Sequence, residues 1–310
     1  MKLILGERTM RKEYFEYKLP AILWLPESEP LAVVQVVHGM TEHLERYEAL
    51  AEILTEHGVA VVGFDLRGHG KTLQGTTCAS LGENGWNYTL QEIHEFHQLM
   101  KERFAHAKHY LLGFSLGSFL VREYFSINGC SDFAGAIIMG TGQQPAFLLS
   151  VILMIVKGEI KKAGFDQTTE LVRTLSFGTY NKKFAPNRTK ADWLCSDTAE
   201  LDKYIADELS KEDISAGLFY ELLDSMKRLA NPNTYDKCNK EMPVLLLSGE
   251  SDPVGDFGKG VKLVEKSIKK AGMKNVSCKM YEGGRHDILH EVEKVIAKDV
   301  CEQIIEFVLR

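Results

Sequence analysis

One short stretch restricts the fold of this chain more than any other. Residues 113–117 read GFSLG, a G-x-S-x-G pattern placed between a segment typical of a strand (109–114) and one typical of a helix (116–125). A serine at such a tight turn is held in a strained conformation with its hydroxyl exposed, and the flanking glycines remove side chains that would clash. The pattern alone also fits an ordinary turn in which Ser115 caps the helix. The flanking strand and helix favour a nucleophilic serine.

Strand and helix patterns alternate on both sides of this turn. Apolar and β-branched runs predict strands at 32–37, 59–64, 109–114, 134–139, 243–248 and 276–281. Apolar residues at helical spacing predict helices at 50–54, 92–104, 116–125, 261–271 and 292–309. This alternation predicts an α/β fold with a mostly parallel central sheet flanked by helices. Two shorter segments, 13–18 and 21–25, predict a hairpin at one edge of the sheet.

The alternation stops after residue 142 and resumes near residue 237. Residues 143–236 hold helical patterns and loops without a clear buried strand. Their apolar and aromatic content, Trp193 and Tyr220 included, favours a packed element over a linker to a second function. We therefore expect a core formed by residues 1–142 and 237–310, with a helical cap of residues 143–236 inserted after the sixth strand.

A nucleophilic serine needs a histidine base and a carboxylate that orients the base. In this architecture the acid and then the histidine follow the serine, in loops after later strands. Asp252 follows the predicted strand 243–248, and His286 follows the predicted strand 276–281. We therefore predict a catalytic triad of Ser115, Asp252 and His286. The rival residues nearby are Glu250, Asp256 and Asp287 for the acid, and His290 for the base.

The negative oxygen that forms during acyl transfer needs two preorganised backbone N–H donors. The amide of Leu116, directly after the serine, is one expected donor. The other is expected from the loop after the predicted strand 32–37, where Gly39 allows close approach and Met40 supplies the N–H group. His38 in this loop is expected to be structural, because it is fixed at a strand end away from the serine.

Five stretches occur in an order that resembles one known group of enzymes. They are HGMTEHLERY at 38–47 (H-G-x-x-E-H-x-x-R-Y), DLRGHG at 65–70, GFSLG at 113–117, Asp252, and GRH at 284–286. Together they resemble the monoacylglycerol lipases and lysophospholipases of the α/β-hydrolase superfamily, which are also grouped with serine aminopeptidase-like (S33) hydrolases. The resemblance covers about residues 13–142 and 237–310, and it is weakest in the insertion.

The resemblance implies an α/β-hydrolase fold and a serine carboxylic-ester hydrolase that works through an acyl-enzyme. Carried over by position, it supports the triad above and Met40 and Leu116 as oxyanion donors. It implies single-chain lipid esters, monoacylglycerol or lysophospholipid, as substrates. A small-ester carboxylesterase or a peptidase or amidase of the same fold stays open as an alternative. A non-catalytic binding protein is disfavoured because Ser115, Asp252 and His286 are all present.

The run 147–156 in the insertion is apolar on every helical face. A surface helix needs only one apolar stripe, so this one needs a second contact. The cap's own core, a partner subunit, a membrane surface or a bound acyl chain would each provide it. If an acyl chain does, the substrate-binding residues are Leu148, Leu149, Ile152 and Leu153. Transient membrane-surface contact through the cap is the related expectation.

Net charge and cysteine spacing restrict the partners and cofactors that the chain is expected to bind. The chain has 37 Lys and Arg against 43 Asp and Glu, a net charge of −6, which favours no nucleic-acid partner. Six cysteines without zinc-site spacing, and the lack of a phosphate-loop or dinucleotide motif, predict no metal and no cofactor. Residues 1–8 have only three apolar residues in a row, at 3–5, before charge returns, which is too short for a signal-peptide core. The apolar run at 146–156 is too short to span a membrane. We expect a cytoplasmic protein, and its oligomeric state stays open.

Overall fold

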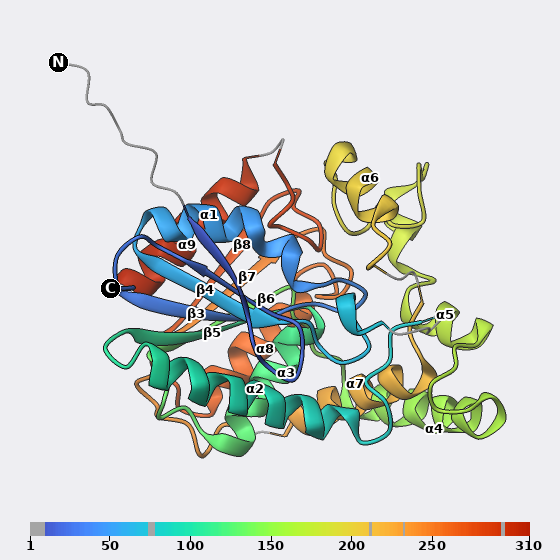
Figure 1. Ribbon diagram of the computed structural model, residues 1–310. Helices are drawn as coiled ribbons and strands as arrows, with labels where there is room; N and C mark the ends of the chain where they lie inside the picture. Colours follow the sequence, from blue (N-terminus) through green and yellow to red (C-terminus); the bar gives the residue numbers. More distant parts are fainter. Residues whose placement is uncertain (1–9, 74–77, 211–212, 232, 293–294) are drawn as a thin grey trace.

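The computed structural model describes residues 10–73, 78–210, 213–231, 233–292 and 295–310. In this part of the chain a central sheet lies between two layers of helices, and a further group of helices lies to one side (Figure 1). The N-terminal residues 1–8, expected to hold no signal-peptide core, lie outside the described residues.

The sheet has eight strands in the order β1-β2-β4-β3-β5-β6-β7-β8. They are β1 Arg11–Phe15, β2 Ala21–Leu25, β3 Ala32–Val37, β4 Val59–Phe64, β5 Lys108–Phe114, β6 Gly135–Met139, β7 Val244–Gly249 and β8 Val276–Tyr281. β1 pairs antiparallel with β2 at one edge, as the sequence predicted, and β3 to β8 are parallel. Every residue of β3 and β4 is buried, because helices cover both faces of a parallel sheet.

Two groups of helices cover the two faces of the sheet (Figure 1). The side chains of α1 (Glu48–Glu56) and α9 (Ile296–Leu309) share one buried apolar cluster with one face. The side chains of α2 (Gly85–Arg103), α3 (Leu116–Asn128) and α8 (Lys259–Lys270) share another with the opposite face. The predicted α/β-hydrolase architecture is thus the observed one.

The helices between β6 and β7 are α4 (Ala146–Ala163), α5 (Glu170–Ser176), α6 (Thr198–Ala206) and α7 (Ala216–Leu229). They are inserted after the sixth strand, as predicted. Buried Arg122 on α3 donates to the carbonyl of Gly142 and to the side chain of Gln143, and Gln143 donates to the carbonyl of Met226 on α7. These bonds anchor the chain where it leaves the sheet, which supports our proposal that the cap begins at residue 143.

The apolar helix α4 has two different faces. Leu149, Leu153 and Val156 are buried, and α4 packs against α7. The other face leaves Phe147 82% exposed and Met154 70% exposed. Within the described residues, no helix is both long enough and apolar enough to cross a membrane.

Candidate active site

Ser115 lies at the turn between β5 and α3, in a backbone conformation that is rare for a residue with a side chain. Its φ is 50° and its ψ is −116°, and its amide donates to the carbonyl of Met139 at 3.0 Å. The turn depends on two close approaches. A Cβ atom at Gly113 would lie 2.4 Å from the carbonyl oxygen of Gly117, and one at Gly117 would lie 1.9 Å from that of Val37. Only glycine fits either position, so these two residues hold the half-buried serine in its strained conformation.

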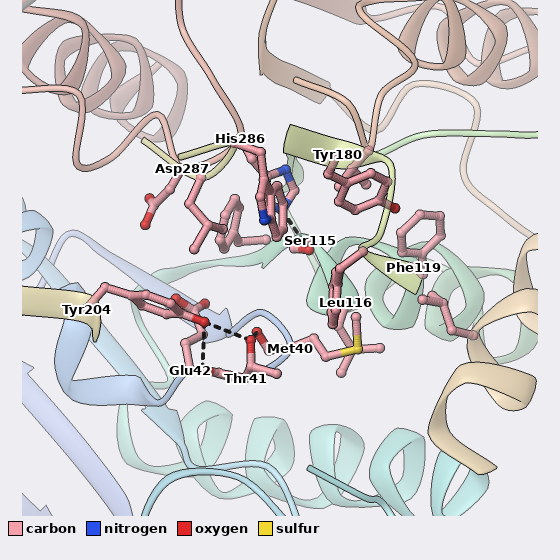
Figure 2. A pocket seen from close by; sticks show the side chains of 16 residues that line it. Met40, Thr41, Glu42, Ser115, Leu116, Phe119, Tyr180, Tyr204, His286 and Asp287 are labelled. Carbon is pink, nitrogen blue, oxygen red and sulfur yellow. Dashed lines mark hydrogen bonds between the residues drawn. The ribbon is translucent and has the colours of Figure 1, made fainter. Parts of the chain in front are cut away.

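The structure brings Ser115, His286 and Asp252 together. The Nε2 atom of His286 lies 2.8 Å from the Oγ atom of Ser115, a contact visible in Figure 2. The Nδ1 atom of His286 lies 2.9 Å from the Oδ2 atom of Asp252. Asp252 and His286 are both fully buried. A hydroxyl, an imidazole and a carboxylate are therefore aligned in one hydrogen-bonded chain.

The rival acids and the rival base occupy other positions. Both ring nitrogens of His286 are already bonded, to Ser115 and Asp252. Asp287 instead accepts hydrogen bonds from Arg46 at 2.8 Å and binds the ring of His290 at 2.8 Å. The remaining two rivals lie on the loop after β7, where Glu250 is exposed and Asp256 is half-buried.

The surroundings of His286 favour its protonated form. Burial by itself would lower the pKa of this imidazole. The carboxylate of Asp252 outweighs that effect through its charge and hydrogen bond, and Asp287 and Glu42 act in the same direction, so the pKa is raised above its ordinary value. The histidine is thus prepared to accept a proton.

Buried Glu42 fixes the shape of the loop after β3. Its carboxylate accepts hydrogen bonds from the amide of Gly39 at 2.5 Å, the hydroxyl of Tyr47 at 2.8 Å and the guanidinium of Arg46 at 3.1 Å. Met40, which lies inside this braced loop, faces the same pocket as Ser115 (Figure 2).

The two predicted oxyanion donors border that pocket. Leu116 is the first residue of α3, so its amide has no carbonyl partner within the helix. The Met40 amide donates to no acceptor among the described residues. Two residues that line the pocket of Ser115 therefore carry amides without a backbone acceptor among the described residues.

His38 has a structural role, as predicted. Its Nδ1 atom lies 2.8 Å from the carbonyl of Gly39, and its Nε2 atom accepts from the amide of Leu66 at 2.9 Å. Burial lowers its pKa to about 3, so the ring stays neutral. It joins the loop after β3 to the loop after β4.

The pocket above Ser115 is narrow, with a cavity volume of about 50 Å³. One part of its wall is polar and is formed by Thr41, Glu42, Tyr204 and Asp287. The rest is apolar or aromatic and is formed by Met40, Phe114, Leu116, Phe119, Phe177, Tyr180, Trp193, Leu194, Leu222 and Val254. Figure 2 shows Tyr204 and Thr41 on one side of Ser115, and Phe119 and Tyr180 on the other. The pocket is therefore amphipathic.

The four predicted substrate-binding residues of α4 do not line this pocket. Leu149 and Leu153 are buried, Ile152 is half-buried, and Leu148 is exposed. The acyl roof expected on α4 is not part of the wall of this pocket, because α4 packs on α7 and it is α7 that packs on α3 beside Ser115. Leu222 of α7 takes the place that was expected for α4.

Sequence reasoning missed the residues of the cap that do line the pocket. They are Phe177, Tyr180, Trp193, Leu194, Tyr204 and Leu222. Most lie in short elements and loops between α5 and α6, where no periodic pattern marks a buried face. The density of aromatic residues between 177 and 204 was the available signal. Among the described residues, no group of three or more His, Cys, Asp or Glu could hold a metal ion.

Comparison with known proteins places the chain among α/β-hydrolases. The family model for serine aminopeptidase, S33, matches residues 28–293. A monoglyceride lipase homolog of Monkeypox virus is 24% identical, over 91% of this chain and 90% of the viral protein. The monoglyceride lipase of Rattus norvegicus is 23% identical, over 91% of this chain and 83% of the rat protein. The chain also spans 22% of the length of an uncharacterized abhydrolase domain-containing protein of Dictyostelium discoideum.

Solved structures show the same fold. A thermostable carboxyl esterase from Bacillus coagulans, solved in complex with glycerol, has a TM-score of 0.83 at 24% identity. That likeness covers 96% of this chain and 97% of the esterase.

The close approach at Gly117 yields a stability prediction. Gly117→Ala should lower the free energy of unfolding by about 3 kcal/mol, because its Cβ must displace the backbone of β3. Gly158→Ala on α4 is the matched control: nothing lies near its added Cβ, and alanine favours a helix, so stability should rise by about 0.5 to 1 kcal/mol. Urea denaturation measures both. Equal effects at the two positions would contradict the role given to Gly117.

Proposed function

The chain belongs to the serine aminopeptidase S33 family of α/β-hydrolase-fold serine hydrolases, and we propose that it cleaves single-chain lipid esters such as monoacylglycerol or lysophospholipid. The observation that carries the proposal is the bonded chain Ser115–His286–Asp252 at the base of an amphipathic pocket. The monoglyceride lipases among the relatives support the same substrate class.

The proposed reaction has two halves. The Oγ atom of Ser115 attacks the ester carbonyl carbon while His286 takes the proton of the serine hydroxyl. The carbonyl oxygen becomes negative and is bound by the amides of Met40 and Leu116. The ester C–O bond then breaks, the protonated His286 gives its proton to the leaving alcohol, and the acyl group stays on Ser115. In the second half, His286 takes a proton from a water molecule as that water attacks the acyl carbon. The bond between the acyl carbon and the Oγ atom of Ser115 then breaks, His286 returns the proton to Oγ, and the fatty acid is released. Asp252 supports the imidazolium in both halves.

The pocket lining favours an ester over a peptide substrate. An aminopeptidase must bind a free ammonium group, and a free carboxylate is the natural partner for it. The two carboxylates among the described lining residues, Glu42 and Asp287, are both already bonded to Arg46. The hydroxyls of Thr41 and Tyr204, 2.9 Å apart, suit an uncharged head group, and the apolar wall suits one acyl chain.

The outer face of α4 supports contact with a lipid surface. Phe147 and Met154 are highly exposed, and exposed Lys157, Lys161 and Lys162 follow on the same helix. Apolar side chains bordered by lysines suit a membrane interface. We include in the proposal that this face of α4 contacts lipid aggregates transiently while the substrate enters.

Removing the nucleophile or the acid should abolish turnover. Ser115→Ala and Asp252→Asn should each lower kcat for a 4-nitrophenyl ester on the order of 10⁴-fold, because triad members act as a unit. Glu250→Gln should have little effect, since Glu250 is exposed. Steady-state kinetics with melting temperatures alongside provide the measurement. A folded Ser115→Ala variant that keeps most of its activity would refute the assignment.

The acid limb of the pH profile should report His286. Only the neutral imidazole can accept the serine proton, and its pKa is raised above the ordinary 6.5. Therefore kcat/KM should be constant at alkaline pH and fall as the pH drops through an apparent pKa above 6.5. An acid limb with an apparent pKa in the range of ordinary carboxyl groups would exclude His286 as the base that controls the rate.

Activity should depend on acyl chain length. For 4-nitrophenyl esters from acetate to laurate, kcat/KM should rise until the acyl chain covers the apolar wall. Each buried methylene should add up to about 0.8 kcal/mol of binding free energy. Leu222→Phe, which narrows the pocket, should move the preferred chain to a shorter length. A flat profile would favour the small-ester alternative, and faster cleavage of aminoacyl amides would favour a peptidase.

The outer face of α4 provides the control for this series. Phe147→Ser and Met154→Ser lie away from the pocket lining, so dissolved acetate ester should be cleaved at the wild-type rate. Both changes should slow hydrolysis of monoacylglycerol held in phosphatidylcholine vesicles. Equal rates on vesicles would remove the lipid-surface contact from the proposal and leave the chemistry untouched.

A further inference from the structure

A segment of the cap is hydrogen-bonded to the loop that carries His286. The amide of His286 donates to the carbonyl of Trp193 at 3.4 Å, and the amide of Asp287 donates to the carbonyl of Leu194 at 2.7 Å. These two main-chain bonds set cap residues 193–194 alongside residues 286–287. The cap therefore touches the proposed base directly, through backbone as well as side chains.

Side chains reinforce the same junction. Buried Glu291 accepts hydrogen bonds from the amide of Arg285 at 3.0 Å and from both the amide and the hydroxyl of Ser196. The guanidinium of Arg285 donates to the carbonyls of Asp192 and Cys195. Since these bonds flank Trp193 on both sides, its position relative to His286 is firmly held.

The rings of Trp193 and His286 lie against each other. Their centroids are 5.2 Å apart and their planes are inclined by 34°, and the ring of Phe114 lies 4.9 Å from the same imidazole. The indole is itself held by Phe177, stacked at 5.8 Å, and by Tyr180, edge-on at 4.9 Å. The indole thus meets the imidazole at a distance at which a positive ring is attracted to an aromatic face.

We propose that Trp193 is a positioning residue for His286, whose indole holds the imidazole toward Ser115 and stabilises the imidazolium that forms during turnover. This rests on the proposed function, in which His286 is the base. The two hydrogen bonds of His286 hold its ring nitrogens between Ser115 and Asp252. The aromatic contact opposes any tilt of the ring that would break this alignment. Because Trp193 belongs to the cap, the base is fully supported only while this part of the cap is in place.

The charged groups around His286 stay the same when Trp193 is changed. Asp252, Asp287 and Glu42 act on the imidazole, and Arg46 pairs with both Asp287 and Glu42. None of these side chains takes a hydrogen bond from the indole of Trp193. A fall in the pKa of His286 on substitution of Trp193 therefore reports the aromatic contact, because greater exposure of the imidazole would raise its pKa instead.

The direct test is an NMR titration of His286 in the Ser115→Ala background, which requires no turnover. The His286 signal is assigned by its loss in a His286→Gln variant. Trp193→Leu, which keeps apolar cover but removes the aromatic face, should lower the pKa of His286 by about one unit. Trp193→Phe should keep most of the wild-type value. Trp193→Met serves as a second non-aromatic variant if the leucine variant does not fold.

Kinetics in the Ser115 enzyme give the second readout. With 4-nitrophenyl acetate, Trp193→Leu should lower kcat about tenfold with little change in KM, and Trp193→Phe should restore most of the loss. Trp86→Leu is the matched control, because Trp86 is a buried tryptophan bonded to Glu123 away from the pocket, and its loss should leave the His286 pKa unchanged.

Three results would overturn the proposal. An unchanged or raised pKa of His286 in Trp193→Leu would refute the aromatic stabilisation. A raised KM confined to long esters would make Trp193 a substrate-contact residue only. An equal loss in the leucine and phenylalanine variants that follows melting temperature would make its role purely structural. If instead no variant and no wild-type enzyme cleaves esters while the pKa still shifts, the proposed function fails and the contact stands.

Discussion

The contact between α3 and β3 at Gly117 is the constraint on which the site depends. With no side chain at this position, the first turn of the helix comes directly against the carbonyl of Val37. That approach sets the N-terminus of α3 at the carboxyl edge of the sheet, which places Ser115 above the sheet and the Leu116 amide beside the loop of Met40. The strain at Ser115 and the available amide at Leu116 are thus two consequences of one packing contact.

A second constraint joins the loop after β3 to the loop that carries His286. Arg46 bonds Glu42 on one side and Asp287 on the other, and Asp287 directly follows His286. Burial opposes the charge of Arg46, but the two carboxylates raise its pKa, so it stays protonated. Without Arg46, two buried acids near His286 would lose the cation that they share, at a cost on the order of several kcal/mol. The pairing also leaves them unsuited to hold a substrate ammonium group.

The fold was largely predictable from the sequence, because its strands are short apolar runs and its strand order follows general rules. β2, β3, β4 and β8 have the predicted boundaries. The α2 helix begins at Gly85 rather than at residue 92, since its first turns bury Trp86 and Leu90 without the spacing that marked the rest. The hydrogen-bonded arrangement of Ser115, His286 and Asp252 could be predicted because the order of these three residue types along the chain follows from the fold.

The cap could not be predicted in the same way. The apolar run on α4 indicated that two faces of the helix need contacts, but a sequence pattern does not identify what makes those contacts. In the structure, one face packs against α7 and the other is exposed. The pocket residues Phe177, Trp193 and Tyr204 come from loops and short elements, where side-chain direction follows from contacts far along the chain.

Because of these contacts, different parts of the cap tolerate amino-acid substitution to different degrees. The outer face of α4 touches neither the pocket nor the base, so its sequence is limited by solubility and by whatever surface it meets. Leu222 and Phe177 line the pocket, so substitutions there change its shape. Residues 192–196 are bonded to the loop of His286 and meet its ring, so a change there alters the base as well as the pocket. A change of substrate preference that preserves the rate is therefore easiest through α7 and hardest through Trp193.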